Sequence, residues 1–255
     1  MLYKYYPKDF DELRKLLEQL LEERGPDADL NDIDVSQITT FYDINKDKGL
    51  FNKLDPHNID ISQWNVSNVK NMHRMFFDCE NFDCDLSDWN VSKDEDMSYM
   101  FSYCQNFSGQ GLENWKPIKC KDMNHMFSYC QNFSGQELEN WKLIKCEDME
   151  GMFFGCNKFN CDLTNWNVSK VEDMSFMFQY CWNFTGEGLE NWNPIKCKDM
   201  NHMFFECSNF NRDLSNWDVR QVKNMADMFN KCINFTGEGL ENWKPIKCKN
   251  MNCMF

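Results

Sequence analysis

The chain has 255 residues, with 27 Lys or Arg against 41 Asp or Glu, which gives a formal net charge of −14 at pH 7. Proteins bind nucleic acids and anionic membranes mainly through lysine and arginine, so this charge argues against both as partners. No run of about 18 apolar residues is present to span or insert into a membrane, and residues 1–8 lack the apolar core of a signal peptide.

Residues 7–24 have the apolar periodicity of a helix. Its apolar face is formed by Phe10, Leu13, Leu17, Leu20 and Leu21. Asp9 and Glu12 have the spacing of a capping box, and Gly25-Pro26 ends the run. We expect residues 1–29 to be an N-terminal capping helix that covers the first unit of the repeat that follows. A helix that binds a partner or a membrane surface is the alternative.

Residues 30–60 predict a degenerate first repeat followed by a loop. Ile33 and Phe41 take the places that Trp and Met occupy in later units. Between Asn45 and Asn58 the spacing lengthens and polar residues predominate. This loop is either a contact site or a tolerated insertion.

Residues 61–255 contain eight copies of a repeat of 25 or 26 residues. The copies are marked by Trp64, Trp89, Trp115, Trp141, Trp166, Trp192, Trp217 and Trp243. In each complete unit, counted from its Trp, a Met follows at +8, Met-Phe at +11 and +12, Cys at +15 and Phe at +18. A period of this length is typical of leucine-rich-repeat solenoids, in which stacked units share one core. At roughly 4.8 Å per unit, eight units form a rod on the order of 40 Å long.

The spacing within a unit predicts one helix and one strand. Met97, Met100, Phe101 and Cys104 fall at i, i+3, i+4 and i+7, which favours one or two helical turns over 96–104. The Trp-x-Val alternation around residues 86–91 favours a short parallel strand. We therefore expect an α/β repeat solenoid, right-handed and leucine-rich-repeat-like. It should have one short parallel β-strand and one short helix per 25/26-residue coil.

Two kinds of unit alternate imperfectly. In one kind Trp is followed by Asn or Asp and then Val, and in the other by a segment such as Lys116-Pro-Ile-Lys-Cys120. Units of the second kind are preceded by one extra residue in a glycine-containing segment, as in Phe107–Leu112. This insertion predicts a bulge in a loop and no change in the core.

At these columns the sequence resembles the BspA-like leucine-rich-repeat surface proteins of bacteria, in particular the 25-residue repeat of mycoplasma lipoproteins. The match is carried by Asp85–Ser92 with Asp96–Cys104, and again by Asp213–Val219 with Asn224–Phe229. It covers about residues 30–255, and the Lys-Pro-Ile-Lys-Cys segments depart from it. The resemblance implies a cell-surface or secreted protein that functions in adhesion and recognition.

Seven of the fourteen cysteines occupy one repeat column, and four more stand five residues after a Trp. Cysteines in packing columns behave as small buried hydrophobes, so we expect reduced core thiols, which favour a reducing compartment. Because the resemblance favours the cell surface, the localisation stays open.

No cofactor, metal site or catalytic motif is expected. His125 and His202 share a column but lie three units apart, too far to share a zinc ion, and no Cys-x-x-Cys occurs. Neither a phosphate-binding loop nor a serine nucleophile elbow is present. The Asp that precedes the first Met of many units is interpreted as a first-turn residue favoured by the helix dipole.

A lysine row is the candidate binding surface. It consists of Lys93, Lys119, Lys145, Lys170, Lys196 and Lys247, each four residues after a Trp. Glu113, Glu139, Glu190 and Glu241 form an acidic row that we expect to relieve the repulsion between the lysines. Such a surface recognises an acidic or mixed-charge partner, or it serves only as a solvated face that resists aggregation.

The sequence therefore predicts a non-catalytic recognition scaffold that binds a protein or glycan partner through its extended repeat face. The repeat stops in mid-unit at Phe255, so the alternative is a structural subunit that stacks end to end, unless the sequence is truncated. A cysteine-based redox or metal sensor is the third hypothesis.

Overall fold

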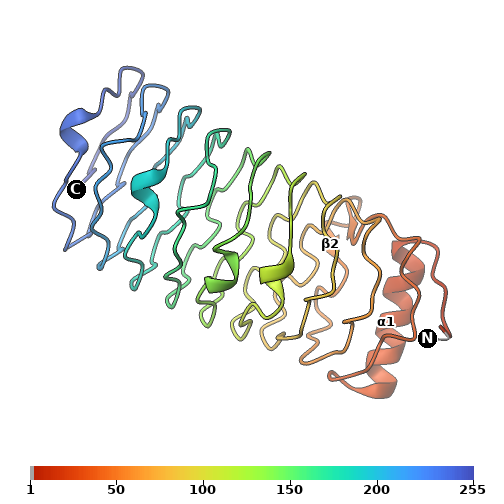
Figure 1. Ribbon diagram of the computed structural model, residues 1–255. Helices are drawn as coiled ribbons and strands as arrows, with labels where there is room; N and C mark the ends of the chain where they lie inside the picture. Colours follow the sequence, from red (N-terminus) through yellow and green to blue (C-terminus); the bar gives the residue numbers. More distant parts are fainter. Residues whose placement is uncertain (1–2) are drawn as a thin grey trace.

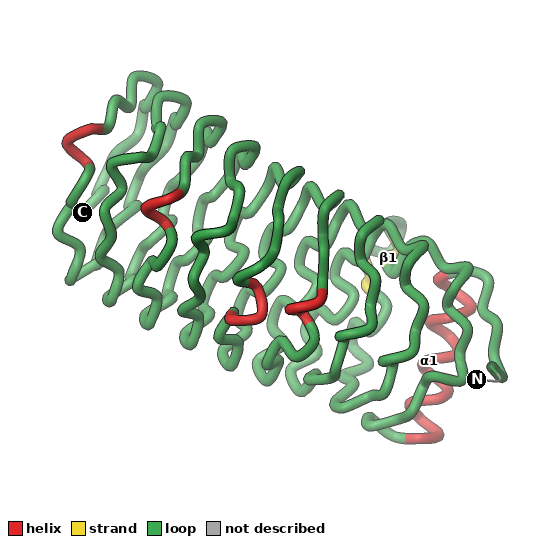
Figure 2. Tube along the Cα trace, in the orientation of Figure 1, coloured by secondary structure: helices red, strands yellow, loops and turns green. Residues whose placement is uncertain are grey.

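The structure is a computed structural model that describes residues 3–255. The chain winds into successive coils that stack along one axis, with α1 (Phe10–Arg24) at the N-terminal end and the C-terminus at the other (Figure 1). Turns and loops make up most of each coil (Figure 2). The other regular elements are β1 (Tyr42–Asp43), β2 (Lys48–Gly49) and the short 3-10 helices η1 (Leu112–Asn114), η2 (Gln136–Leu138), η3 (Leu189–Asn191) and η4 (Leu240–Asn242).

The helix α1 begins and ends at the predicted signals. The Asp9 carboxylate accepts a hydrogen bond from the Glu12 backbone N–H at 3.0 Å, and the Glu12 carboxylate accepts one from the Lys8 N–H at 2.9 Å. At the other end Gly25 has φ 87° and its N–H donates to the Leu21 carbonyl at 2.9 Å. The predicted helix is confirmed, although it starts at Phe10. Residues 1 and 2 of the predicted N-terminal unit lie outside the described residues.

The apolar face of α1 packs against the N-terminal end of the core. Leu13, Leu17 and Leu20 are completely buried in the same cluster as the coil residues. Arg14 is also buried and donates to the Leu50 carbonyl at 2.5 Å and to the Glu18 carboxylate at 2.8 Å. Because this face is covered, it is not available to the partner or membrane surface that the sequence left open.

Backbone hydrogen bonds join each coil to the next at alternate residues. The N–H groups of Met97, Tyr99, Phe101 and Tyr103 donate to carbonyls 25 residues further along the chain, at 2.8–3.0 Å. Parallel bridges link the residue before the first Met of each unit, as in Asn71 to Asp96 and Asp96 to Asp122. Equivalent residues of successive units therefore lie over one another.

The predicted helical turns over 96–104 and the predicted strand around 86–91 are both wrong. Residues 96–104 form consecutive turns, and their alternate N–H groups donate to the next coil instead of to residue i−4. The positive φ of Tyr99 and Tyr103, 55° and 65°, is incompatible with a helix. In the other segment, the Trp89 N–H closes a turn on Leu86 at 3.1 Å.

The core consists of ladders of identical side chains. Each repeat Trp donates its indole N–H to a carbonyl of the preceding coil, as Trp115 does to Leu86 at 3.0 Å. The rings of Trp89 and Trp115 lie parallel, with centroids 6.3 Å apart. The Cys104 thiol donates to the Phe76 carbonyl at 3.0 Å, and its equivalents in the column make the same contact. All fourteen cysteines are free, and twelve of them are buried.

The predicted glycine bulge is confirmed at the start of η1. Gly111 has φ 93°, and a Cβ on it would lie 2.3 Å from the backbone nitrogen of Ser87 in the preceding coil. Only glycine combines this backbone conformation with this close approach. Equivalent glycines precede η3 and η4.

The long loop after the first coil folds back on α1. β1 and β2 pair in a short antiparallel hairpin, Tyr42 with Gly49. Lys46 on the hairpin contacts Asp11 of α1 at 2.7 Å, and Asp47 accepts a hydrogen bond from Arg74 at 2.5 Å. The loop thus connects α1 to the first coils.

Candidate functional site

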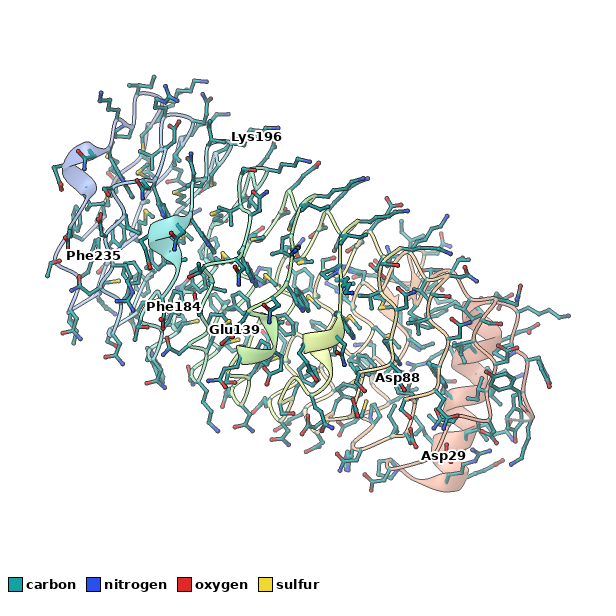
Figure 3. All side chains as sticks on the ribbon, viewed as in Figure 1. Asp29, Asp88, Glu139, Phe184, Lys196 and Phe235 are labelled. Atoms are coloured by element: carbon teal, nitrogen blue, oxygen red, sulfur yellow. The ribbon has the colours of Figure 1, made fainter. Side chains whose placement is uncertain are left out.

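The six residues of the lysine row are all exposed, on the segment that follows each Trp. Figure 3 shows Lys196 pointing outward at the upper margin of the molecule, whereas Glu139 of the acidic row lies on the near face. Lys93 donates to Asn68 at 2.9 Å and Lys247 to Gln221 at 2.5 Å. The other four lysines form no ion pair or side-chain hydrogen bond with any residue from 3 to 255.

Direct contact with the acidic row does not supply the relief of repulsion that the sequence led us to expect for the lysine row. No ion pair joins the two rows within the described chain, because Glu113, Glu190 and Glu241 lie in 3-10 helices before the Trp, away from the lysines. The ion pairs occur two residues beyond the lysine row instead. There Lys121 contacts Glu95 at 3.2 Å, and Lys198 contacts Glu172.

Basic residues are concentrated along one edge of the stack. We define the basic edge as the six residues that follow each repeat Trp. It contains fifteen of the 27 Lys and Arg residues but only five of the 41 Asp and Glu residues, and all fifteen basic side chains are exposed. Its last position is linked from coil to coil by backbone hydrogen bonds, such as Lys121 N–H to the Glu95 carbonyl at 3.0 Å. The edge is therefore continuous.

Exposed isoleucines accompany the lysines on this edge. Ile118, Ile144, Ile195 and Ile246 are 39%, 45%, 42% and 76% exposed. Each stands directly before a lysine of the lysine row. The remaining units have Ser67, Ser92, Ser169 and Arg220 at this position. The edge thus contains four coils with a polar residue at this position and four with an exposed isoleucine.

A second surface carries partly exposed aromatic side chains that the sequence reasoning missed. We call this surface the aromatic face. It comprises Tyr99, Tyr103, His125, Tyr129, Phe154, Phe176, Tyr180, His202 and Phe205. The rings of Tyr99 and His125 stack at 4.8 Å, and those of Tyr103 and Tyr129 at 4.7 Å. The signal that could have found this face is the recurrence of aromatic residues ten and fourteen positions after the Trp.

The aromatic face is built on left-handed backbone. The residues ten and fourteen positions after each Trp have positive φ, including His125 at 50° and Tyr129 at 61°. In the next unit these two positions are Gly151 and Gly155. A Cβ on Gly151 would lie 2.3 Å from the His125 ring, so the glycines make room for the rings above them. Phe154 packs edge-on against Tyr129 at 5.0 Å and continues the face.

A column of aspartates forms the parallel bridges beside the aromatic face. Its members are Asp96, Asp122, Asp148, Asp173 and Asp199. The column ends at Asn71 and Asn224, whose side-chain amides donate to Asp96 at 3.1 Å and to Asp199 at 3.3 Å. Burial raises the pKa of Asp122 and Asp173, and raises that of Asp148 to about 6. Neighbouring carboxylates of the column add to this effect.

Each aspartate of the column closes a local turn. The Asp148 carboxylate, for example, accepts the Glu150 backbone N–H at 2.9 Å. This Asx turn explains the recurrence of Asp or Asn at the position, so the predicted helix-dipole role is wrong. A groove of about 440 Å³ runs past Asp122, Asp148 and Asp173. Among residues 3–255 no group of side chains has the arrangement of a metal site.

His73, Ser98 and Asp96 lie together, but not in the order that a catalytic triad needs. The Ser98 hydroxyl donates to Asp96 at 2.5 Å, and the His73 Nδ1 contacts the same hydroxyl. In a triad the carboxylate binds the other imidazole nitrogen, and the serine is open to substrate. Ser98 is only 2% exposed. The cluster therefore stabilises the join between two coils.

A comparison with protein families gives three overlapping matches along the chain. The family is described as Mycoplasma protein of unknown function, DUF285, and it matches residues 15–136, 104–188 and 178–255. The chain belongs to the DUF285 family. The successive DUF285 matches agree with the tandem repeats read from the sequence. No curated protein matches the chain. The DUF285 description names no activity, so functional inference depends on the surfaces described above.

None of the helices in residues 3–255 has both the length and the apolar composition needed to cross a bilayer.

Proposed function

We propose that this protein is a non-catalytic recognition scaffold that binds a protein partner through the aromatic face. One observation carries the proposal. Large aromatic side chains occupy left-handed backbone positions on a partly exposed surface, as at Tyr99, Tyr103, His125 and Tyr129.

This arrangement is costly if its only role is structural. Left-handed geometry costs a residue other than glycine on the order of 1–3 kcal/mol. Glycine, asparagine and aspartate fill such positions more easily, and Gly151 and Asp227 do so in the same column. Tyrosine, by contrast, is enriched among the residues that contribute most to binding at protein interfaces. A role in contact with a partner accounts for tyrosine at these positions.

The stacking of the rings favours a protein over a glycan. A sugar ring binds an aromatic residue by lying on the face of its ring. Here the faces of Tyr103 and Tyr129 cover one another at 4.7 Å, as do those of Phe176 and His202 at 5.1 Å. Ring edges and hydroxyl groups remain for a partner, and these suit side chains and backbone groups of a protein.

The proposal includes the leucine-rich-repeat-like solenoid and the adhesion-type surface role that the BspA-like resemblance implies. The in-register parallel bridges and the stacked Trp column support a solenoid. In this chain the bridges between coils are single residues, and turns stand where a helix was expected in each repeat.

The double substitution Tyr103→Asn and Tyr129→Asn tests the proposal. Asparagine tolerates the left-handed backbone, so the fold should be kept. We expect capture of the partner from host-cell extract to fall at least about tenfold, because interface tyrosines of this kind contribute about 2 kcal/mol each. The matched control is Tyr6→Ser, which removes a 63%-exposed tyrosine outside the face.

The readout is quantitative mass spectrometry of proteins retained by the immobilised chain, with circular dichroism of each variant. Equal retention by the wild type and the double variant would contradict the proposal. Retention that survives protease treatment of the extract but not glycosidase treatment would assign the scaffold to a glycan instead.

A further inference from the structure

We propose that the basic edge docks the protein on an anionic lipid surface. This inference goes beyond the recognition function, because it uses a different surface and a partner of different chemistry.

The first argument is the segregation of charge. The net charge of −14 describes the chain as a whole, but the basic edge has ten more positive than negative side chains and the remainder has 24 more negative than positive ones. A phosphate-rich surface therefore attracts one edge and repels the rest of the molecule. The argument from net charge, which assumes evenly spread charge, does not apply to this edge.

The second argument is the presence of isoleucine among the lysines. In the third unit Ile118 lies between Lys116 and Lys119, and one coil further Ile144 lies between Lys142 and Lys145. All six side chains are exposed, and they belong to neighbouring coils joined by backbone hydrogen bonds. Apolar side chains flanked by lysines are typical of segments that bind at the lipid–water interface. There the lysines reach the phosphates and the isoleucines enter the region of the acyl chains.

Other anionic partners leave one of these features unexplained. Protein interfaces are depleted in lysine and enriched in arginine and aromatic residues, whereas the edge contains a single arginine, Arg220, and no aromatic residue. Proteins that bind single-stranded nucleic acids stack the bases on exposed aromatic rings, which the edge lacks. A soluble acidic polysaccharide would use the lysines but would leave the isoleucines in water.

The shape of the edge agrees with a flat partner. The coils stack along one axis (Figure 1), and the last position of the edge is linked from coil to coil by backbone hydrogen bonds, so the edge runs along the stack; Lys196 lies on it (Figure 3). Many lysines can then reach the same surface at once, and each contact adds to the binding. The aromatic face is built from other positions of each coil, ten to fourteen residues after the Trp, so the two surfaces share no residue.

The test is flotation of the full chain with vesicles. Vesicles of phosphatidylcholine and phosphatidylglycerol in equal parts are compared with vesicles of phosphatidylcholine alone, at low and at high salt. We expect the wild type to float with the charged vesicles only, and its binding to weaken steeply with salt. Failure of the wild type to bind the charged vesicles at low salt would overturn the proposal without any use of variants.

Two pairs of substitutions separate the roles of charge and apolar contact. Lys119→Glu with Lys145→Glu should weaken binding roughly tenfold or more, because two attractive charges become repulsive. Ile118→Ser with Ile144→Ser keeps every charge and should weaken binding about tenfold by removing the apolar contact. The control, Lys15→Glu with Lys158→Glu, makes the same charge change at exposed sites outside the edge and should bind within about threefold of the wild type.

Each outcome bears on the proposal. Loss of binding in both edge variants, with the control unaffected, supports it. Loss in the lysine variant alone would show that the isoleucines do not enter the lipid and that the edge only senses negative charge, and would overturn the proposal. Because capture of a protein by the aromatic face is measured without lipid, the two proposals can fail separately.

Discussion

Asp94 is the residue that fits its surroundings least. Equivalent positions in neighbouring coils are Val69 and Cys120, both buried. Asp94 is completely buried, and one carboxylate oxygen accepts the Asp96 N–H at 2.9 Å. The other oxygen has no hydrogen-bond partner in the described chain. Burial raises the pKa of this carboxyl well above its ordinary value.

Asp94→Val should stabilise the protein by about 1–3 kcal/mol at pH 7, because it removes an unsatisfied buried polar atom and restores the side chain seen in other coils. The measurement is the free energy of unfolding in urea. The control Asp88→Val changes an exposed aspartate and should alter stability by no more than about 0.5 kcal/mol. A loss of stability in Asp94→Val would show that the buried carboxyl is needed.

The aspartate column should make the protein more stable as the pH falls. The pKa of Asp148 is about 6 in the folded protein, above the ordinary value of about 3.9, so the folded state binds a proton that the unfolded state has released. The charged Asp148 carboxylate therefore destabilises the folded state; this effect is fully present above pH 6 and is lost as the pH falls toward 4.

Asp148→Asn should remove part of this pH dependence, on the order of 1–2 kcal/mol between pH 7 and pH 4. Asparagine keeps the turn, as Asn224 does by accepting the Ala226 N–H at 3.2 Å. Urea unfolding at both pH values gives the comparison, with Asp88→Asn as the control. If the free energy of unfolding of Asp148→Asn changed between the two pH values as much as that of the wild type, the column would not titrate as described.

At the scale of elements, α1 stabilises the first coils through its buried leucines. Leu17 is completely buried in the core cluster. Leu17→Ala should cost about 2–5 kcal/mol, because it leaves a cavity between the helix and the coils. Gln19→Ala, on the exposed side of the same helix, should change the free energy of unfolding by no more than about 0.5 kcal/mol. Similar values for the two variants would mean that α1 is detached in solution.

The sequence predicted α1 better than the coils because its signals are local. Asp9, Glu12 and Gly25 fix both ends of α1 within a few residues of the chain. In residues 96–104 the same apolar spacing belongs to consecutive turns, because the hydrogen bonds that hold them go to a coil 25 residues away. The left-handed backbone at Tyr99 also could not be predicted from the sequence, since tyrosine is not a typical residue for this conformation. The aromatic face was therefore interpreted as part of a helix.

The lysine row could be located from the sequence because it depends only on the period. The lysine row lies in a polar segment, which predicts that its side chains are exposed, and all six are exposed in the structure. The lack of ion pairs between this row and the acidic row could not be derived in this way, because the distance from Lys119 to Glu113 depends on where each turn directs the chain. Counting the charges at every position after the Trp would have revealed the basic edge from the sequence.

For the whole molecule, the thiols report on the integrity of the stack. Cys253 is exposed, Cys248 is partly exposed and the other twelve cysteines are buried. Burial raises the pKa of thiols in the column, such as Cys104, so they contain little reactive thiolate. We expect one fast-reacting thiol and one slower thiol in the native protein. The other twelve should react only after denaturation.

The assay is titration with a chromogenic disulfide, run in buffer and in denaturant. The denatured sample is the control, because all fourteen thiols should then react. Several fast thiols in the native protein would contradict the buried ladders and would revive the hypothesis of a cysteine-based sensor.

The tryptophan column also has an optical consequence. Successive indoles such as Trp192, Trp217 and Trp243 lie nearly parallel, with centroids 6.1–6.2 Å apart. At this separation the excited states of neighbouring rings couple, and excitation passes from one ring to the next before it is emitted. Because the rings are nearly parallel, each transfer changes the direction of the emitting dipole only slightly, so the fluorescence anisotropy of the intact column stays high. Uncoiling at either end allows the released tryptophans to rotate and lowers the anisotropy.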